Sequence, residues 1–169
     1  LGKGLAEIHS FQAKFIGNPS GTFQVPLEEF KSHILKISNE LVNRFYSNNA
    51  SIRNAFPTFE QQLASLPVPR EATLVLIDMD PTQFLSDGTT ITGLVDTEAY
   101  AIAPREFEFI GLEYVLTEKA ARAFKSGYET IMPIPQLEKC RQPYRYLYRL
   151  LSVQGSVELE KWLSHPSYF

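Results

Sequence analysis

The hydrophobic pattern of this 169-residue chain changes twice along its length, and this is the strongest constraint on its fold. Up to about residue 66, apolar residues recur every three or four positions, as they do on one face of an α-helix. Across 73–96, short β-branched or alternating segments surround the turn signal Asp87-Gly88, which is typical of strands joined by a hairpin. Helical spacing returns from about residue 107. The sequence therefore predicts an α+β protein, mostly helical with a small central β-hairpin region, rather than a parallel sheet of βαβ units.

Apolar positions and capping residues place the individual helices. The first pattern ends at turn residues near 18–21, and the second covers 27–46. Thr58 and Gln61 have the spacing of a capping box, which predicts a third helix over 58–66. Further helices are predicted over 107–115, after the capping residue Thr117, over 137–153 and around 159–163.

Composition narrows the class of protein. The single cysteine, Cys140, permits no intramolecular disulfide and no thiolate metal cluster, which favours a buried, reduced thiol. No apolar run approaches the ~18 residues of a membrane-spanning helix, and no signal-peptide pattern is present. The net charge of −3 is too small to suggest a nucleic-acid surface. We therefore expect a cytoplasmic protein with neither a membrane nor a nucleic acid as partner.

The negative charge is concentrated in the middle of the chain. Residues 51–117 hold ten carboxylates and three arginines, a balance of −7, whereas the segments before and after carry +1 and +3. Such a segment suggests a site for a metal ion or a basic ligand. A solvated acidic face is the commoner cause of such a charge run, and it remains the alternative.

Other polar residues have simpler expected roles. His9 lies near the apolar face of the first helix, so we expect a hydrogen-bonded, partly buried imidazole rather than a metal ligand. The other two histidines have no acidic or cysteine partner at metal-ligand spacing. Arg141, Arg145 and Arg149 recur every four residues, which predicts a solvated helix face, with a phosphate-binding or partner surface as the alternative.

Two aspartates leave the ends of two predicted strands. Asp78 follows one strand and Asp96 follows the second strand of the hairpin, so the hairpin would bring them near each other. Rigid scaffolds hold reactive groups at such strand ends. Phosphoryl transfer needs one carboxylate to accept the proton of the attacking hydroxyl and another to hold the metal ion. Oxygen ligands alone suit Mg²⁺.

At these positions the sequence resembles the aminoglycoside phosphotransferase and choline kinase family of small-molecule kinases. Residues 76–83, Leu-Ile-Asp-Met-Asp-Pro-Thr-Gln, are similar to the family's His-Gly-Asp-x-His-x-x-Asn motif. Residues 95–98, Val-Asp-Thr-Glu, are similar to its Ile-Asp-Trp-Glu-like motif. Residues 1–10, 104–110 and 124–128 are similar to flanking family segments, so the resemblance covers nearly the whole chain.

The resemblance implies a fold, a reaction and a role for each site residue. The fold would be that of a protein kinase, with residues 1–169 forming the C-terminal lobe. Asp78 would orient and deprotonate a small acceptor, and ATP would supply the phosphoryl group. The acidic middle of the chain would suit a cationic acceptor such as an amino sugar or amino alcohol. Asp96 and Gln83 would hold Mg²⁺, with Asp80 and Glu98 as accessory acids. A carboxylate near residue 108 would tie the start of a helix to the catalytic loop.

Three departures from the family motif affect function. Leu76-Ile77 stands where the family has His-Gly, Asp80 where it has a second His, and Gln83 where it has a metal-binding Asn. The Gln83 amide oxygen is one methylene farther out, and an octahedral Mg²⁺ site tolerates displacement poorly. Asp80 could supply a third carboxylate, or its charge could raise the pKa of Asp78. A non-catalytic, kinase-like binding or regulatory module is therefore the alternative.

The nucleotide-binding half of such a kinase is not recognisable in this sequence. A Gly-rich loop and a strand lysine, which cover the phosphates in this fold, are not found. The chain also begins at Leu1 inside a helical pattern, without an N-cap residue. We therefore expect an N-terminal lobe of the same polypeptide to be missing, and this chain alone to be inactive.

Overall fold

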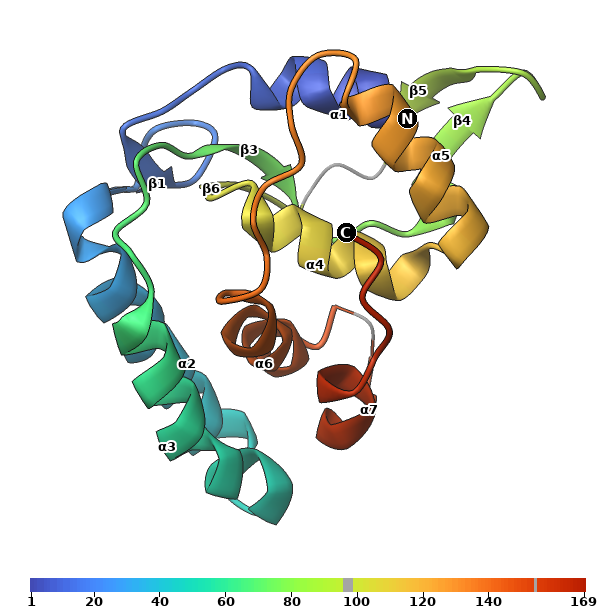
Figure 1. The fold of residues 1–169 in the computed structure, drawn as a ribbon. Coiled ribbons are helices and arrows are strands. Elements are labelled where there is room, and N and C mark those ends of the chain that lie inside the picture. The colour runs from blue at the N-terminus through green and yellow to red at the C-terminus, as the bar shows by residue number, and fades with distance from the viewer. Residues whose placement is uncertain (96–98, 154) are drawn as a thin grey trace.

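The computed structural model describes residues 1–95, 99–153 and 155–169, and these form an α+β protein (Figure 1). The described helices are α1 (Gly2–His9), α2 (Phe30–Phe45), α3 (Ala50–Ser65), α4 (Glu106–Val115), α5 (Glu118–Tyr128), α6 (Arg141–Leu151) and α7 (Leu159–Leu163). The described strands are β1 (Phe15–Gly17), β2 (Gln24–Pro26), β3 (Thr73–Leu76), β4 (Phe84–Ser86), β5 (Ile91–Leu94) and β6 (Tyr100–Ala103). Two 3₁₀ turns cover Leu27–Glu29 and Pro81–Gln83.

Four strands form an antiparallel sheet in the order β2-β1-β6-β3, and β4 and β5 form a separate hairpin. The strand β3, the hairpin and its turn agree with the prediction. Asp87 shapes the turn, because its Oδ1 accepts hydrogen bonds from the amides of Thr89 and Thr90. The β-structure is larger than the single hairpin region that the sequence predicted, because β1, β2 and β6 were not predicted. These strands have three or four residues each, too few to display an alternating pattern.

The helices surround the sheet unequally. α1 packs on α5, whereas α2, α3 and α7 all pack on α6. Figure 1 shows α2 and α3 side by side on one flank, with the β4–β5 hairpin projecting at the opposite side. Stacked aromatic rings join α4 to the C-terminal helices: Phe107 lies 4.2 Å from Tyr148, and Tyr114 lies 4.1 Å from Trp162, between ring centroids. Within the described residues, no helix is long and apolar enough to cross a membrane.

The predicted boundaries of three helices are wrong. The first helix, expected to reach the turn residues near 18–21, ends at His9, and β1 follows at Phe15–Gly17. α3 begins eight residues before the expected start, because the Asn49 side chain accepts a hydrogen bond from the Ile52 amide and caps the helix there. The helix then continues through Pro57. The predicted helix over 137–153 is shorter in the structure: α6 begins at Arg141 and ends beside Ser152, which adopts a left-handed conformation.

The arginine stripe of α6 is a further correction, because these side chains do not form a solvated face. Arg145 and Arg149 are buried, and Arg141 is largely covered. Arg141 Nε and Arg145 Nη2 lie 3.1 Å and 3.0 Å from Oε2 of the buried Glu113. Spacing alone could not reveal this, because the partner carboxylate lies on another helix.

Candidate functional site

The segment that carries Asp78 lies between two backbone contacts. β3 ends at Leu76, and the amide of Ile77 donates to the carbonyl of Ala99 at 2.9 Å, just before β6 begins. At the base of the hairpin, the Val95 amide donates to the Gln83 carbonyl, also at 2.9 Å. The chain therefore leaves β3, passes Asp78, forms the hairpin and returns to pair with β3.

A buried carboxylate fixes the start of this segment. Glu108 of α4 is fully buried, and its Oε1 accepts a hydrogen bond from the Leu76 amide at 3.2 Å. Its Oε2 lies 2.5 Å from His9 Nε2, and the other ring nitrogen of His9 lies 2.8 Å from the Tyr128 hydroxyl. Burial raises the pKa of Glu108, although the hydrogen bond with His9 opposes the shift. The expectation of a hydrogen-bonded His9 is confirmed, although its imidazole is fully rather than partly buried. Glu108 joins α4 to the last residue of β3, and the assignment of the following residues as a catalytic loop stays a prediction.

The charge of Asp78 acts on a buried tyrosine of the core. The pKa of Tyr148 is raised well above its usual value, first by burial and then by the charges of Glu108 and Asp78. Asp78 itself is half-buried, whereas the neighbouring Met79 is fully buried. Gly111 leaves room for the Tyr148 hydroxyl, since a Cβ atom there would lie only 2.7 Å from it.

Asp80 and Gln83 occupy different environments although they are three residues apart. Asp80 is exposed, and its Oδ1 accepts hydrogen bonds from the amide and the hydroxyl of Thr82 at 2.8 Å and 2.7 Å. These hydrogen bonds lower the pKa of Asp80. Gln83 is buried, and its backbone is held at both ends by Asp80 and Val95.

One short segment of the chain, 78–83, contains three of the five predicted site residues: Asp78, Asp80 and Gln83. The other two, Asp96 and Glu98, lie outside the described residues. In the part of the chain that is described, no group of three His, Cys, Asp or Glu side chains could hold a metal ion. A carboxylate and an amide oxygen are nevertheless the donor types that suit Mg²⁺.

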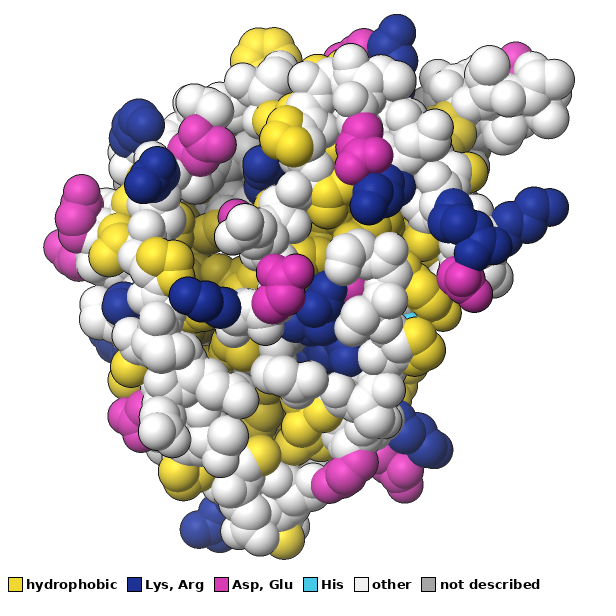
Figure 2. All heavy atoms as spheres, viewed as in Figure 1, with side chains coloured by type: hydrophobic (Ala, Val, Ile, Leu, Met, Phe, Trp, Pro, Cys, Tyr) yellow, Lys and Arg dark blue, Asp and Glu magenta, His cyan; other side chains and the backbone are white. Residues whose placement is uncertain are grey.

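The acidic middle of the chain does not act as one charged face. Asp80 and Asp87 accept hydrogen bonds from nearby threonines, Glu108 meets His9, and Glu113 meets two arginines, so at least four of its eight described carboxylates have local partners. Figure 2 shows acidic side chains scattered singly over the face in view.

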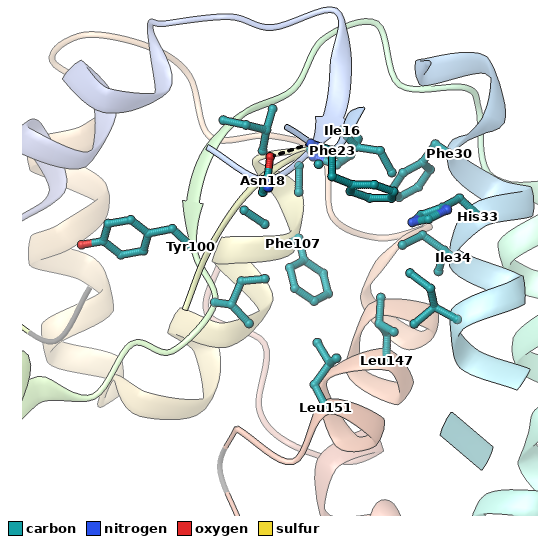
Figure 3. A pocket seen from close by; sticks show the side chains of 17 residues that line it. Ile16, Asn18, Phe23, Phe30, His33, Ile34, Tyr100, Phe107, Leu147 and Leu151 are labelled. Atoms are coloured by element: carbon teal, nitrogen blue, oxygen red, sulfur yellow. Dashed lines mark hydrogen bonds between the residues drawn. The ribbon is translucent and has the colours of Figure 1, made fainter. Parts of the chain in front are cut away.

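An apolar cavity of about 300 Å³ lies beside the Asp78 segment and was not foreseen from the sequence (Figure 3). Its walls come from the β1–β2 loop, α2, β6, α4 and α6, which are far apart in the chain. Ile77, the residue before Asp78, forms part of the wall. The lining residues are Ile16, Gly17, Asn18, Phe23, Phe30, His33, Ile34, Ile37, Ile77, Tyr100, Ala101, Ile102, Ala103, Pro104, Phe107, Leu147 and Leu151.

Comparison with protein-family models, curated protein sequences and solved structures finds no match to this chain. We therefore infer function from the residues and contacts described above and from the motif resemblance.

Proposed function

We propose that this chain is the C-terminal lobe of a cytoplasmic small-molecule phosphotransferase, similar to the aminoglycoside phosphotransferase and choline kinase family. It would transfer the γ-phosphoryl group of ATP to a hydroxyl group of a small acceptor. An N-terminal lobe of the same polypeptide would supply the loop and the lysine that cover the nucleotide phosphates.

The path of the chain around Asp78 is the observation that most supports this proposal. A strand leads into Asp78, a hairpin follows, and β6 returns to pair antiparallel with β3 through the register Leu76 to Tyr100. The described residues that flank positions 96–98, Val95 and Ala99, have backbones bonded to Gln83 and Ile77. These two contacts support the proposal that the second acidic motif lies beside the first.

In the proposed reaction, Asp78 accepts the proton of the acceptor's hydroxyl group. The hydroxyl oxygen forms a bond to the γ-phosphorus, and the bond from that phosphorus to the bridging oxygen breaks, so that ADP leaves with the electron pair. Asp96 and Gln83 would hold Mg²⁺, which neutralises phosphate charge when bound, with Asp80 and Glu98 nearby. Glu108 acts indirectly, because it holds the amide of Leu76 two residues before Asp78.

Two observations favour the alternative, a kinase-like binding or regulatory module without turnover. The apolar Leu76 occupies the position of the family histidine, and its side chain is buried rather than available to a substrate. The exposed carboxylate of Asp80 also closes on its own turn, which uses part of its capacity to accept further bonds.

Phosphate transfer by the polypeptide that includes the N-terminal lobe distinguishes these functions. We expect transfer from labelled ATP to a hydroxyl acceptor, and Asp78→Asn should slow it by about 10²–10⁴-fold because the general base is lost. Asp87→Asn, at the tip of the hairpin, is the matched control and should leave the rate unchanged. An Asp78→Asn variant with undiminished transfer would exclude the assigned base. Binding of a small ligand without any ATP binding would favour the non-catalytic module.

A further inference from the structure

The cavity beside the Asp78 segment is distinguished by its apolar lining. A volume of about 300 Å³ reaches the lower limit of small-molecule binding sites. An apolar cavity of only about 150 Å³ is known to stay dry and bind benzene. The cavity is thus large enough for a small organic molecule.

The side chains around the cavity are almost entirely aliphatic or aromatic. None of the residues that line it is Asp, Glu, Lys or Arg. Of its polar members, Asn18 is engaged in its own loop, since Oδ1 accepts from the Phe23 amide at 3.0 Å and Nδ2 donates to the Thr22 hydroxyl at 2.7 Å. His33 lies against the Phe23 ring, 5.4 Å between centroids. Figure 3 shows these residues at one end of the cavity, with Leu147 and Leu151 at the other.

This lining discriminates between classes of ligand. A cation that entered the cavity would lose its hydration and meet no carboxylate, which disfavours its binding. An uncharged apolar group would lose no hydrogen bonds and would gain contact with the wall. The cavity therefore selects against the cationic ligand that the acidic middle of the sequence suggested.

The position of the cavity links it to the candidate reaction. Ile77 contributes to its wall and is directly followed by Asp78, and Tyr100 of β6 lies opposite Leu76 in the sheet register. Phe107, also in the wall, stacks on Tyr148, whose pKa responds to the charge of Asp78. Asp78 does not itself line the cavity, so a molecule whose apolar body fills it would have to extend past Ile77 to bring a polar end to Asp78.

We infer that this cavity binds the uncharged, apolar body of the acceptor, and that the phosphoryl acceptor is a hydrophobic alcohol rather than an amino sugar or amino alcohol. The inference that the ligand is a substrate rests on the proposed phosphotransferase function. The inference that the cavity binds an apolar alcohol depends only on its lining.

Methyl NMR of the 169-residue chain tests the binding directly, with 2-phenylethanol and the 2-phenylethylammonium ion as matched probes. The two probes share an aromatic body and differ in charge. We expect 2-phenylethanol to shift the methyl signals of Ile34, Ile77 and Ile102 saturably, and the ammonium ion to bind at least about tenfold more weakly. The methyl of Ile52, which is fully buried in α3 and outside the cavity lining, should not move.

Substitutions on α2 provide the structural control. Ile34→Trp should fill the cavity and abolish the shifts of Ile77 and Ile102, whereas Lys36→Trp places the same side chain at an exposed position two residues along and should leave binding intact. The unchanged Ile52 signal reports that each variant is folded. If Ile34→Trp does not fold, Leu151→Phe fills the cavity from α6 instead.

Equal or tighter binding of the ammonium ion, or the absence of a saturable shift, would overturn the inference. Alcohol binding is measured on the 169-residue chain without ATP, which separates this test from that of the reaction. Saturable binding of 2-phenylethanol together with failure of transfer by the complete polypeptide would contradict the proposed function and leave the cavity assignment standing.

Discussion

Helix α4 carries two buried carboxylates whose surroundings differ. Glu108, 0% exposed, meets the imidazole of His9 and the backbone amide of Leu76. Glu113, 1% exposed, meets the guanidinium groups of Arg141 and Arg145. It also accepts hydrogen bonds from the amides of Tyr168 and Phe169 at 3.0 Å and 3.4 Å.

The difference shows that one helix can hold two separate segments of the chain by two kinds of contact. A guanidinium group stays charged across the physiological pH range, so Glu113 holds the C-terminal segment through a permanent ion pair. An imidazole can be neutral or charged, so the contact of Glu108 depends on protonation. Glu108 holds the segment that carries Asp78, which is where the proposed function needs precise positioning.

The largest predicted effect is at the permanent ion pair. Glu113→Ala should lower the free energy of unfolding by about 3–5 kcal/mol, because it leaves two largely covered guanidinium groups without a counter-charge. Urea denaturation measures this change. Glu118→Ala, which removes an exposed ion pair with Arg122, is the control and should have little effect. Similar destabilisation by both variants would contradict the account.

A smaller effect is expected at the second carboxylate. Glu108→Ala should cost about 1–3 kcal/mol, because it leaves the buried Leu76 amide and the Nε2 atom of His9 without a partner. Glu108→Gln should recover much of this loss, since an amide can accept from Leu76 and donate to an imidazole nitrogen. Urea denaturation of both variants checks the order, and a glutamine variant no more stable than the alanine variant would refute the assigned hydrogen bonds.

The helix that supplies His9 offers a test without any change of charge. A Cβ atom at Gly2 would lie 2.0 Å from the Phe124 carbonyl of α5, so Gly2→Ala should destabilise the protein by about 1–3 kcal/mol. Gly4 has no atom within 4 Å of the same position, and Gly4→Ala should stabilise it by up to about 1 kcal/mol through helix propensity. Opposite signs in thermal denaturation are the expected result, and equal signs would show that α1 and α5 do not approach so closely.

The pH dependence of stability should distinguish the carboxylates further. Burial raises the pKa of Glu108 above its usual value of 4.5, so the folded state binds more protons than the unfolded state between that value and the raised pKa. The free energy of unfolding should therefore fall as pH rises through this window. Denaturation at a series of pH values should show that Glu108→Gln removes this fall, and an unchanged slope would mean that another group causes it.

The sequence predicted features that depend on neighbouring residues and missed those that depend on distant ones. The hairpin turn at Asp87 and the helix cap at Thr117, which accepts from the Ala120 amide, follow from local side-chain chemistry and are confirmed. The burial of Arg145 was missed because its partner, Glu113, lies 32 residues away on another helix.

The same distinction between local and distant residues applies to the candidate site. The segment with Asp78 and Gln83 could be located from its motif, and Glu108 from the resemblance of its surroundings. The apolar cavity could not, because its lining comes from separate elements whose packing no local pattern encodes.

Amide hydrogen exchange tests most directly the claim that the two carboxylates hold different parts of the molecule. It should be measured in Glu108→Ala and Glu113→Ala at a temperature at which the amides of α6 remain protected. The account predicts faster exchange at Leu76 and Ile77 in the first variant only, and at Tyr168 and Phe169 in the second only. Acceleration of the same amides in both variants, or unchanged exchange at Leu76 in Glu108→Ala, would contradict it.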